Sequence, residues 1–422
     1  MNITDMDPDL LSLELIGDDE RGYDFLDEET MIRLKQLSSE KGVLSLYLDT
    51  RPETVQREPV PVRFKNGIKT ILNKNETNWD HETKQLFEAV AEDVTEALEK
   101  EPLVAEGKGI ALFVAPMRLL PKKEKVDYEL FMSFHLPEAP ADLIHWGQTP
   151  VISPLVVQRD EHPETGVVLF DREKVRFFLY TMGEAAEYTF SFRNEDPVPM
   201  SKSHTWHGYG THNHLKWQEE HYKRYLRQAG IAISKVAQKA EWKWLVLASP
   251  DEQEAKHVID YLPEVIQEKV IGYTTVAMND SLNTVRDRVA PLVREAEIRE
   301  EKATLEKWIG ELEKSDGLAV SGVADTVLAD QEYRLRTLIF PAGFIQKGWQ
   351  CTSCHSLIAD LQESSPDACP YCNSDQLFEK ADIIGEMAVR MLQTGGEVEV
   401  IREKEHRNLV ETHGIVGGLL RY

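Results

Sequence analysis

The chain has few cysteines and no long apolar run. Only four cysteines occur in its 422 residues, all between positions 351 and 372, so structural disulfides elsewhere in the chain are excluded. No window approaches the roughly 18 uninterrupted apolar residues of a membrane-spanning helix, and the N-terminus lacks the basic and apolar regions of a signal peptide. We therefore expect a cytoplasmic protein with no membrane partner.

Positive charge is also scarce, and it is unevenly placed. The net charge is −25, which argues against non-specific nucleic-acid binding but leaves a focused contact open. Residues 1–30 hold eleven acidic residues and one arginine, whereas residues 201–243 hold eight lysines or arginines and three glutamates. We expect residues 1–30 to form a solvated acidic tail. The alternative is an arm that shields the basic segment until nucleic acid displaces it.

The pattern of apolar residues predicts a multidomain α/β protein without internal repeats. Strands alternate with helices in a first domain, residues 31–147, which precedes a central domain, residues 148–314. In the central domain, residues 166–180 read as a hairpin and residues 242–248 as a buried strand. Residues 282–312 read as one long helix, or as two with a break near Pro291. A third domain covers residues 315–422.

The four cysteines predict a structural zinc site. Two Cys-x-x-Cys pairs on knuckle turns can supply four thiolates to one zinc, as in a zinc ribbon at residues 349–374. A redox pair or a disulfide framework is the competing interpretation, and a reducing cytoplasm disfavours both. A closed four-thiolate site leaves no position for substrate, so we expect a structural metal. Its ligands would be Cys351, Cys354, Cys369 and Cys372.

The most unusual segment runs from His204 to His214. It packs four histidines, two glycines and two aromatic residues into eleven positions, and its glycines at 208 and 210 favour an exposed loop. The helix expected behind it, from Leu215, is rich in lysine and arginine. Such a basic helix with a glycine-rich tip is suited to reaching into a polyanion.

Together these pieces resemble the archaeal and eukaryotic class-one release factor and Pelota superfamily. That family places a Gly-Gly-Gln loop, framed as His-Gly-Arg-Gly-Gly-Gln-Ser, before a basic helix in its central domain. The zinc-ribbon insertion and the terminal segment 417–422 add to the resemblance, which implies a central RNase-H-like α/β domain and a C-terminal α/β domain. The matching loop positions are His207, Gly208, Gly210, Thr211, His212 and Asn213.

The chain departs from the family where chemistry would occur. His212 replaces the catalytic glutamine, and Thr211 places a Cβ where the family has glycine. No Asn-Ile-Lys-Ser motif occurs, so we expect no stop-codon reading. Three roles for His212 are open: an inert polar residue, a general base on water, or a metal ligand with His204, His207 and His214.

The resemblance implies a factor that binds the ribosomal A site, in ribosome rescue or hibernation. A translational GTPase would bind through the third domain. Trp206, Tyr209 and Trp217 would stack on RNA bases or pack against the helix. Alternatives are an active peptidyl-tRNA hydrolase, or a nuclease, for which Asp171 alone is not the required carboxylate cluster. The cations expected to contact phosphates of ribosomal or transfer RNA are Lys216, Lys223, Arg224, Arg227 and Lys235.

Overall fold

The chain forms two compact units, which the computed structural model describes over most of their length. The central unit draws on residues 1–21 and 162–299, and the composite unit on residues 22–161 and 300–422. The predicted mixed α/β class is confirmed, whereas the predicted domain ranges stay predictions. The described residues are 10–15, 28–75, 79–99, 108–120, 125–160, 163–171, 174–181, 183–192, 211–360 and 366–422.

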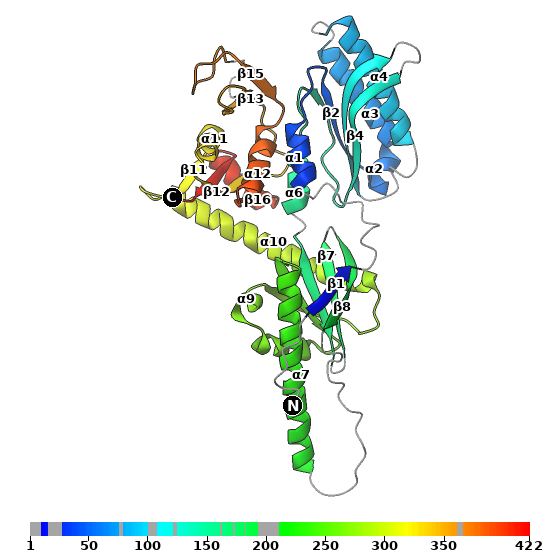
Figure 1. Ribbon diagram of the computed structural model, residues 1–422, viewed down its shortest axis with the longest axis vertical. Helices are drawn as coiled ribbons and strands as arrows, with labels where there is room; N and C mark the ends of the chain where they lie inside the picture. The colour runs from blue at the N-terminus through cyan, green and yellow to red at the C-terminus, as the bar shows by residue number, and fades with distance from the viewer. Residues whose placement is uncertain are drawn as a thin grey trace. The chain divides into compact units, whose positions relative to one another are not determined.

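A six-stranded sheet, in the order β1-β8-β7-β6-β9-β10, is the centre of the first unit (Figure 1). Neighbouring strands from β1 to β6 run antiparallel, and β6, β9 and β10 run parallel. The predicted hairpin is β6 with β7. The strands are β1 (Leu10–Leu15), β6 (Thr165–Phe170), β7 (Val175–Thr181), β8 (Glu184–Phe192), β9 (Trp244–Ser249) and β10 (Val270–Thr275).

Helices cover both faces of this sheet, and β6 and β9 are therefore fully buried. Because both faces are buried, the sequences of these strands are almost entirely apolar. One face packs against α7 (Thr211–Lys239), α8 (Glu252–His257) and the 3₁₀ helix η4 (Val258–Tyr261), with α9 (Glu264–Gln267) beyond. The other face packs against α10 (Leu282–Leu312). The helix α10 is continuous through Pro291, so the break considered there does not occur.

The composite unit begins with a four-stranded antiparallel sheet in the order β4-β3-β2-β5. Alternate residues of β2, including Leu44, Leu46 and Leu48, point into a core that α3 and α4 cover. The elements are β2 (Val43–Asp49), β3 (Gly109–Leu120), β4 (Lys125–Leu136), β5 (Leu143–Gly147), α2 (Pro52–Arg57), α3 (Val60–Lys74) and α4 (His81–Glu99).

The C-terminal part of this unit has a second sheet, ordered β11-β17-β12-β16, and a small three-stranded ribbon, ordered β14-β13-β15. The ribbon is inserted between β12 and α12. The elements are β11 (Ala319–Ser321), α11 (Val323–Gln331), β12 (Leu335–Pro341), β13 (Gly348–Cys351), β14 (Leu357–Ala359), β15 (Leu377–Lys380), α12 (Ile383–Gln393), β16 (Glu397–Ile401), α13 (Lys404–Thr412) and β17 (Gly417–Leu420).

Two short helices, α1 (Glu28–Gln36) and α6 (Ser153–Asp160), join the two parts of the composite unit by packing against α12. The buried carboxylate of Asp382, directly before α12, accepts two hydrogen bonds. One comes from the amide of Gly385 in α12 at 3.1 Å, and the other comes from the amide of Ser153 at the start of α6 at 2.8 Å. One carboxylate therefore caps two helices. Nearby, Lys380 and Glu386 form a buried ion pair at 2.8 Å.

The acidic segment 1–30 is more than the expected tail. It contains β1, and α1 begins within it at Glu28. The sequence Leu10-Leu-Ser-Leu-Glu-Leu15 alternates apolar and polar residues, which predicts a strand. The many acidic residues around it favoured the prediction of a solvated tail instead. Among the described helices none combines the length and apolar character needed to cross a membrane.

Candidate functional site

Helix α7 is the longest element of the central unit that carries net positive charge. Its 29 residues give it a length of about 43 Å. Its second half is anchored by buried residues such as Tyr225, Ile233 and Val236. A Cβ on Gly230 would lie 2.5 Å from the carbonyl oxygen of Tyr261, so glycine permits the close approach of α7 to η4. Figure 1 shows the first turns of α7 extending past the sheet.

The predicted cations of α7 differ in how far they are exposed to solvent. Lys223 and Arg227, one turn apart, are exposed, whereas Arg224 and Lys235 are partly buried. The Nε of Arg224 is buried and has no hydrogen-bond partner. The side chain of Lys216 lies outside the described part of the chain. Of the predicted cations whose side chains the structure describes, Lys223 and Arg227 are therefore the exposed ones.

Only the last part of the predicted loop, from Thr211 onward, lies within the described residues, and it belongs to α7. His207, Gly208 and Gly210 lie outside the described residues, as do His204, Trp206 and Tyr209. Thr211, His212 and Asn213 form the first turn of the helix, so the helix begins four residues earlier than Leu215. The reason is local: the three residues contain no glycine or proline to interrupt a helix. His212 thus belongs to a helix terminus.

The four cysteines converge as predicted. Their Sγ atoms all lie within 4.8 Å of one another. The Sγ atoms of Cys351 and Cys372 are 3.5 Å apart, and those of Cys354 and Cys369 are 3.6 Å apart. Four thiolates about 2.3 Å from a tetrahedral zinc would be separated by about 3.8 Å. The geometry of the four sulfur atoms fits such an ion.

The two Cys-x-x-Cys turns are built alike. His355 donates its amide to the carbonyl of Cys351 at 2.8 Å, and Asn373 donates to the carbonyl of Cys369 at 2.9 Å. Both residues have positive φ, 59° and 58°, the left-handed conformation that closes such a turn. His355 therefore has a backbone role. The matching geometry places one buried and one exposed cysteine on each turn.

The thiol pKa values diverge, as expected when four thiols share a small space. Hydrogen bonds with the hydroxyl and the amide of Ser356 lower the pKa of Cys354 to about 6. The Ser374 amide lowers the pKa of Cys372, but the adjacent Cys354 and Cys351 outweigh it and raise that pKa to about 12. Four ionised thiolates can coexist here only with a cation among them.

The described residues offer no support for the nuclease alternative. Among them, the cysteines are the only group of three or more potential metal ligands that comes together. The carboxylate of Asp171 accepts the amide of Lys174 at 2.8 Å, and the amide of Asp171 donates to the carbonyl of Lys174. These two hydrogen bonds thus join Asp171, directly after β6, to Lys174, directly before β7.

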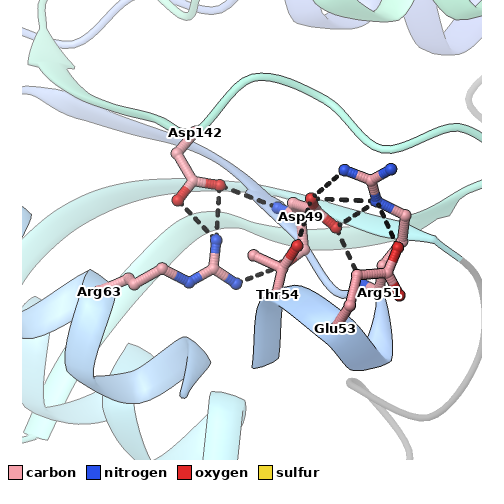
Figure 2. Close-up of polar contacts among 6 residues, drawn as sticks. All are labelled: Asp49, Arg51, Glu53, Thr54, Arg63 and Asp142. Carbon is pink, nitrogen blue, oxygen red and sulfur yellow. Dashed lines mark hydrogen bonds and ion pairs between the residues drawn. The ribbon is translucent and has the colours of Figure 1, made fainter. Parts of the chain in front are cut away.

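A polar network in the composite unit escaped the sequence analysis (Figure 2). Asp49, at the end of β2, accepts two bonds from the Nε of Arg51 at 3.1 Å and one from the Thr54 hydroxyl at 2.9 Å. Arg63 donates to Asp142 at 2.7 Å and to the carbonyl of Asp49. Burial raises the pKa of Asp49, but the bonds from Arg51 and Thr54 outweigh it and lower that pKa. The network fixes α2 and α3 on β2.

Comparison with known proteins finds similarity in the central part of the chain. The model of the Bacterial archaeo-eukaryotic release factor family 10 matches residues 150–294. The predicted resemblance to the release factor and Pelota superfamily is confirmed. The peptide chain release factor subunit 1 of Pyrococcus abyssi is 23% identical over 226 residues, which are 49% of this chain and 55% of that protein. That of Thermococcus sibiricus is 22% identical, covering 49% and 54%.

The chain therefore spans about half the length of these release factors. Two solved structures are also similar. The Dom34 protein of Saccharomyces cerevisiae is 12% identical with a TM-score of 0.39, and 98% of each chain is covered. The Pelota protein of Archaeoglobus fulgidus is 11% identical with a TM-score of 0.32, covering 94% of this chain and 92% of that one.

Proposed function

We propose that the chain is a release-factor-like and Pelota-like translation factor that binds the ribosomal A site in the cytoplasm. It would act in ribosome rescue or hibernation without reading stop codons. One observation carries the proposal: the family match contains the whole of α7, a long basic helix in a chain of net charge −25.

Helix α7 is the proposed RNA contact. Lys223 and Arg227 face solvent and would contact phosphates of ribosomal or transfer RNA, with Lys216, Arg224 and Lys235 along the same helix. Phosphate contacts of this kind carry no sequence information, which suits a factor that recognises a site on the ribosome by shape and charge. Binding should weaken steeply with salt, by about 0.7–0.9 log units per log unit of salt for each phosphate contacted.

Binding without hydrolysis is the favoured mode of action. His212 and Thr211 stand in the first turn of α7, where the family's loop has Gln and Gly. An active peptidyl-tRNA hydrolase remains the alternative, and it would require His212 as a general base. Substitution His212→Ala separates the two: peptide release that depends on His212 would establish the hydrolase, whereas unchanged ribosome binding without release supports the binding factor.

The ribbon would hold a structural zinc ion through Cys351, Cys354, Cys369 and Cys372. The metal would supply no catalysis, because four thiolates fill its coordination sphere. A translational GTPase is the proposed delivery partner, bound through the C-terminal part of the composite unit. The solved Dom34 structure is described as that of a factor interacting with Hbs1, which supports this proposal by similarity.

Co-sedimentation with ribosomes tests the proposed function. We expect the double substitution Lys223→Glu and Arg227→Glu to weaken binding at least about tenfold and to reduce the salt dependence by about two phosphate contacts. The matched control is Lys302→Glu with Lys307→Glu, which makes the same charge change at exposed positions of α10. Equal loss in both variants, or no loss in either, would contradict the role of α7.

A further inference from the structure

Helix α3 differs in charge from the helix beside it. Its 15 residues include four lysines or arginines and no aspartate or glutamate, although the chain as a whole carries a net charge of −25. The neighbouring helix α4, which covers the same sheet (Figure 1), has six acidic residues and one lysine. The two helices therefore separate their charges, and α3 carries the positive ones.

The cations of α3 differ in position. Arg63 is only 8% exposed and binds Asp142, so it belongs to the network of Figure 2. Lys65, Lys69 and Lys74 are exposed. Lys65 and Lys69 lie one turn apart, about 6 Å along the helix axis, and Lys74 ends the helix. Three lysines of α3 are thus accessible to a partner.

These lysines are weakly engaged within the described chain. Lys65 lies 3.6 Å from Glu99, and both side chains are more than half exposed, so this ion pair contributes little to stability. Lys69 forms no ion pair with any residue that the structure describes. A negatively charged partner would meet no carboxylate on α3 itself. The other exposed residues of the helix are neutral: Val62, Asn66, Thr70 and Asn73.

A distant part of the sequence adds positive charge near the C-terminal end of α3. Burial, Lys347 and Lys74 together lower the pKa of His145 to about 4, and burial is the largest cause. Lys347 is exposed and directly precedes β13. Because Lys347 and Lys74 act on the same imidazole, the segment that enters the ribbon contributes to the positive field at this end of the helix.

A phosphate backbone is the partner that fits this surface. Lysine, amide and hydroxyl side chains are the groups that bind phosphates and sugars, and the exposed side of α3 combines all three. A membrane surface would require an exposed apolar face, but the apolar side of α3 is buried against the sheet. The acidic helix α4 repels polyanions, which would confine a nucleic-acid strand to α3.

We propose that α3 is a second RNA contact of the chain, in which Lys65, Lys69 and Lys74 bind phosphates of one RNA strand. It is distinct from α7, which belongs to the central unit. Two linked contacts bind one RNA assembly more tightly than either contact alone. That this RNA is ribosomal rests on the proposed function, whereas the contact itself requires only a phosphate backbone.

Neutralising the three lysines tests the contact. The probe is an oligouridylate of about 20 nucleotides, longer than a typical single-strand site, and fluorescence anisotropy measures its binding to the full-length chain. The triple variant Lys65→Gln, Lys69→Gln and Lys74→Gln should bind at least about tenfold more weakly at about 0.1 M salt. The slope of log K against log salt should fall by about 2, because each phosphate contact of a single strand contributes about 0.7.

Two further variants separate this contact from general effects of charge and folding. The matched control, Lys302→Gln with Lys307→Gln and Lys404→Gln, makes the same charge change at exposed positions of α10 and α13. It should bind the oligouridylate within about twofold of the unchanged chain. Replacement of the three α3 lysines by arginine keeps their charge, and should therefore retain both the affinity and the salt dependence.

Purified ribosomes are the second probe. In co-sedimentation, the α3 variant should bind ribosomes more weakly than the matched control does. Adding Lys223→Glu and Arg227→Glu in α7 should weaken binding beyond the loss in either variant alone, because both contacts then fail.

Each outcome decides between the contact and its alternatives. If the α3 variant binds both probes as tightly as the matched control, or if the full chain binds neither probe, the contact is wrong. If oligouridylate binding depends on α3 but the full chain binds no ribosomes, the contact stands and the proposed function fails. If the α3 variant loses only binding to phosphatidylserine vesicles, the partner is a membrane surface and the RNA contact is overturned.

Discussion

The cysteine ribbon and helix α7 carry the most distinctive stretches of the sequence, and the structure arranges them in opposite ways. In the ribbon, four sulfur atoms converge within 4.8 Å, so every ligand of the proposed site comes from the chain itself. In α7, Lys223 and Arg227 face solvent on successive turns. A convergent site stabilises its own fold, whereas exposed cations contribute little to folding and are suited to binding a partner of opposite charge.

The largest expected effect concerns the ribbon. Cys351→Ser should reduce the zinc content from about one ion per chain to almost none, because apparent binding free energies of such sites reach about 10 kcal/mol or more. Hydrogen exchange should rise throughout residues 348–380 and remain unchanged in β11-β17-β12-β16. The control is Ser353→Ala, within the same turn. If Cys351→Ser retained zinc at full occupancy, the four cysteines would not form the proposed zinc site.

A smaller effect is expected at the buried ion pair of the composite unit. Lys380 and Glu386 are each only 6% exposed. Lys380→Met should destabilise the unit by about 3–5 kcal/mol, because it leaves Glu386 buried without its partner. The double variant Lys380→Met with Glu386→Leu should recover most of that loss. Thermal unfolding measures both, and equal destabilisation would show that packing, not the unpaired charge, dominates.

The stability of the composite unit should depend on pH through His145, which lies in β5. Burial lowers its pKa to about 4, and Lys347 and Lys74 contribute to the shift. Because the unfolded value is about 6.5, folding stability is complete above that pH, falls as the pH drops, and levels off near pH 4. The loss at pH 5 should be about 2 kcal/mol. In His145→Gln this part of the pH dependence should vanish, whereas in the control His81→Gln, at an exposed position of α4, it should remain.

The smallest effect on stability is expected in α7. Reversing Lys223 and Arg227 should change the free energy of unfolding by no more than about 0.5 kcal/mol, because exposed charges contribute little to folding. Urea unfolding with hydrogen exchange of the central unit measures this. A loss of several kcal/mol would mean that these cations stabilise the fold and are not a binding surface.

The sequence predicted those elements whose pattern lies within a short stretch of the chain. The spacing Cys-x-x-Cys gave the ribbon, the run from Gly166 to Tyr180 gave the hairpin β6–β7, and the apolar periodicity of residues 282–312 gave α10 with its limits. Each of these depends on residues close together in the chain, where geometry follows from sequence spacing.

The features that escaped prediction depend on contacts between distant residues. Strand β1 pairs with β8 across more than 150 residues, and no local signal names its partner. The network of Asp49, Arg63 and Asp142 joins a residue of β2, a residue of α3 and the residue that precedes β5 (Figure 2). The predicted roles of His212 and of the α7 cations stay predictions, because they concern a partner that binds from outside.

The most direct test of the account is to recover the tagged chain at low salt and to image any ribosome that accompanies it. The account predicts ribosomes with the central unit in the A site and α7 along the RNA backbone. Absence of ribosomal RNA from the recovered material, or a chain bound elsewhere on the ribosome with α7 facing solvent, would contradict it.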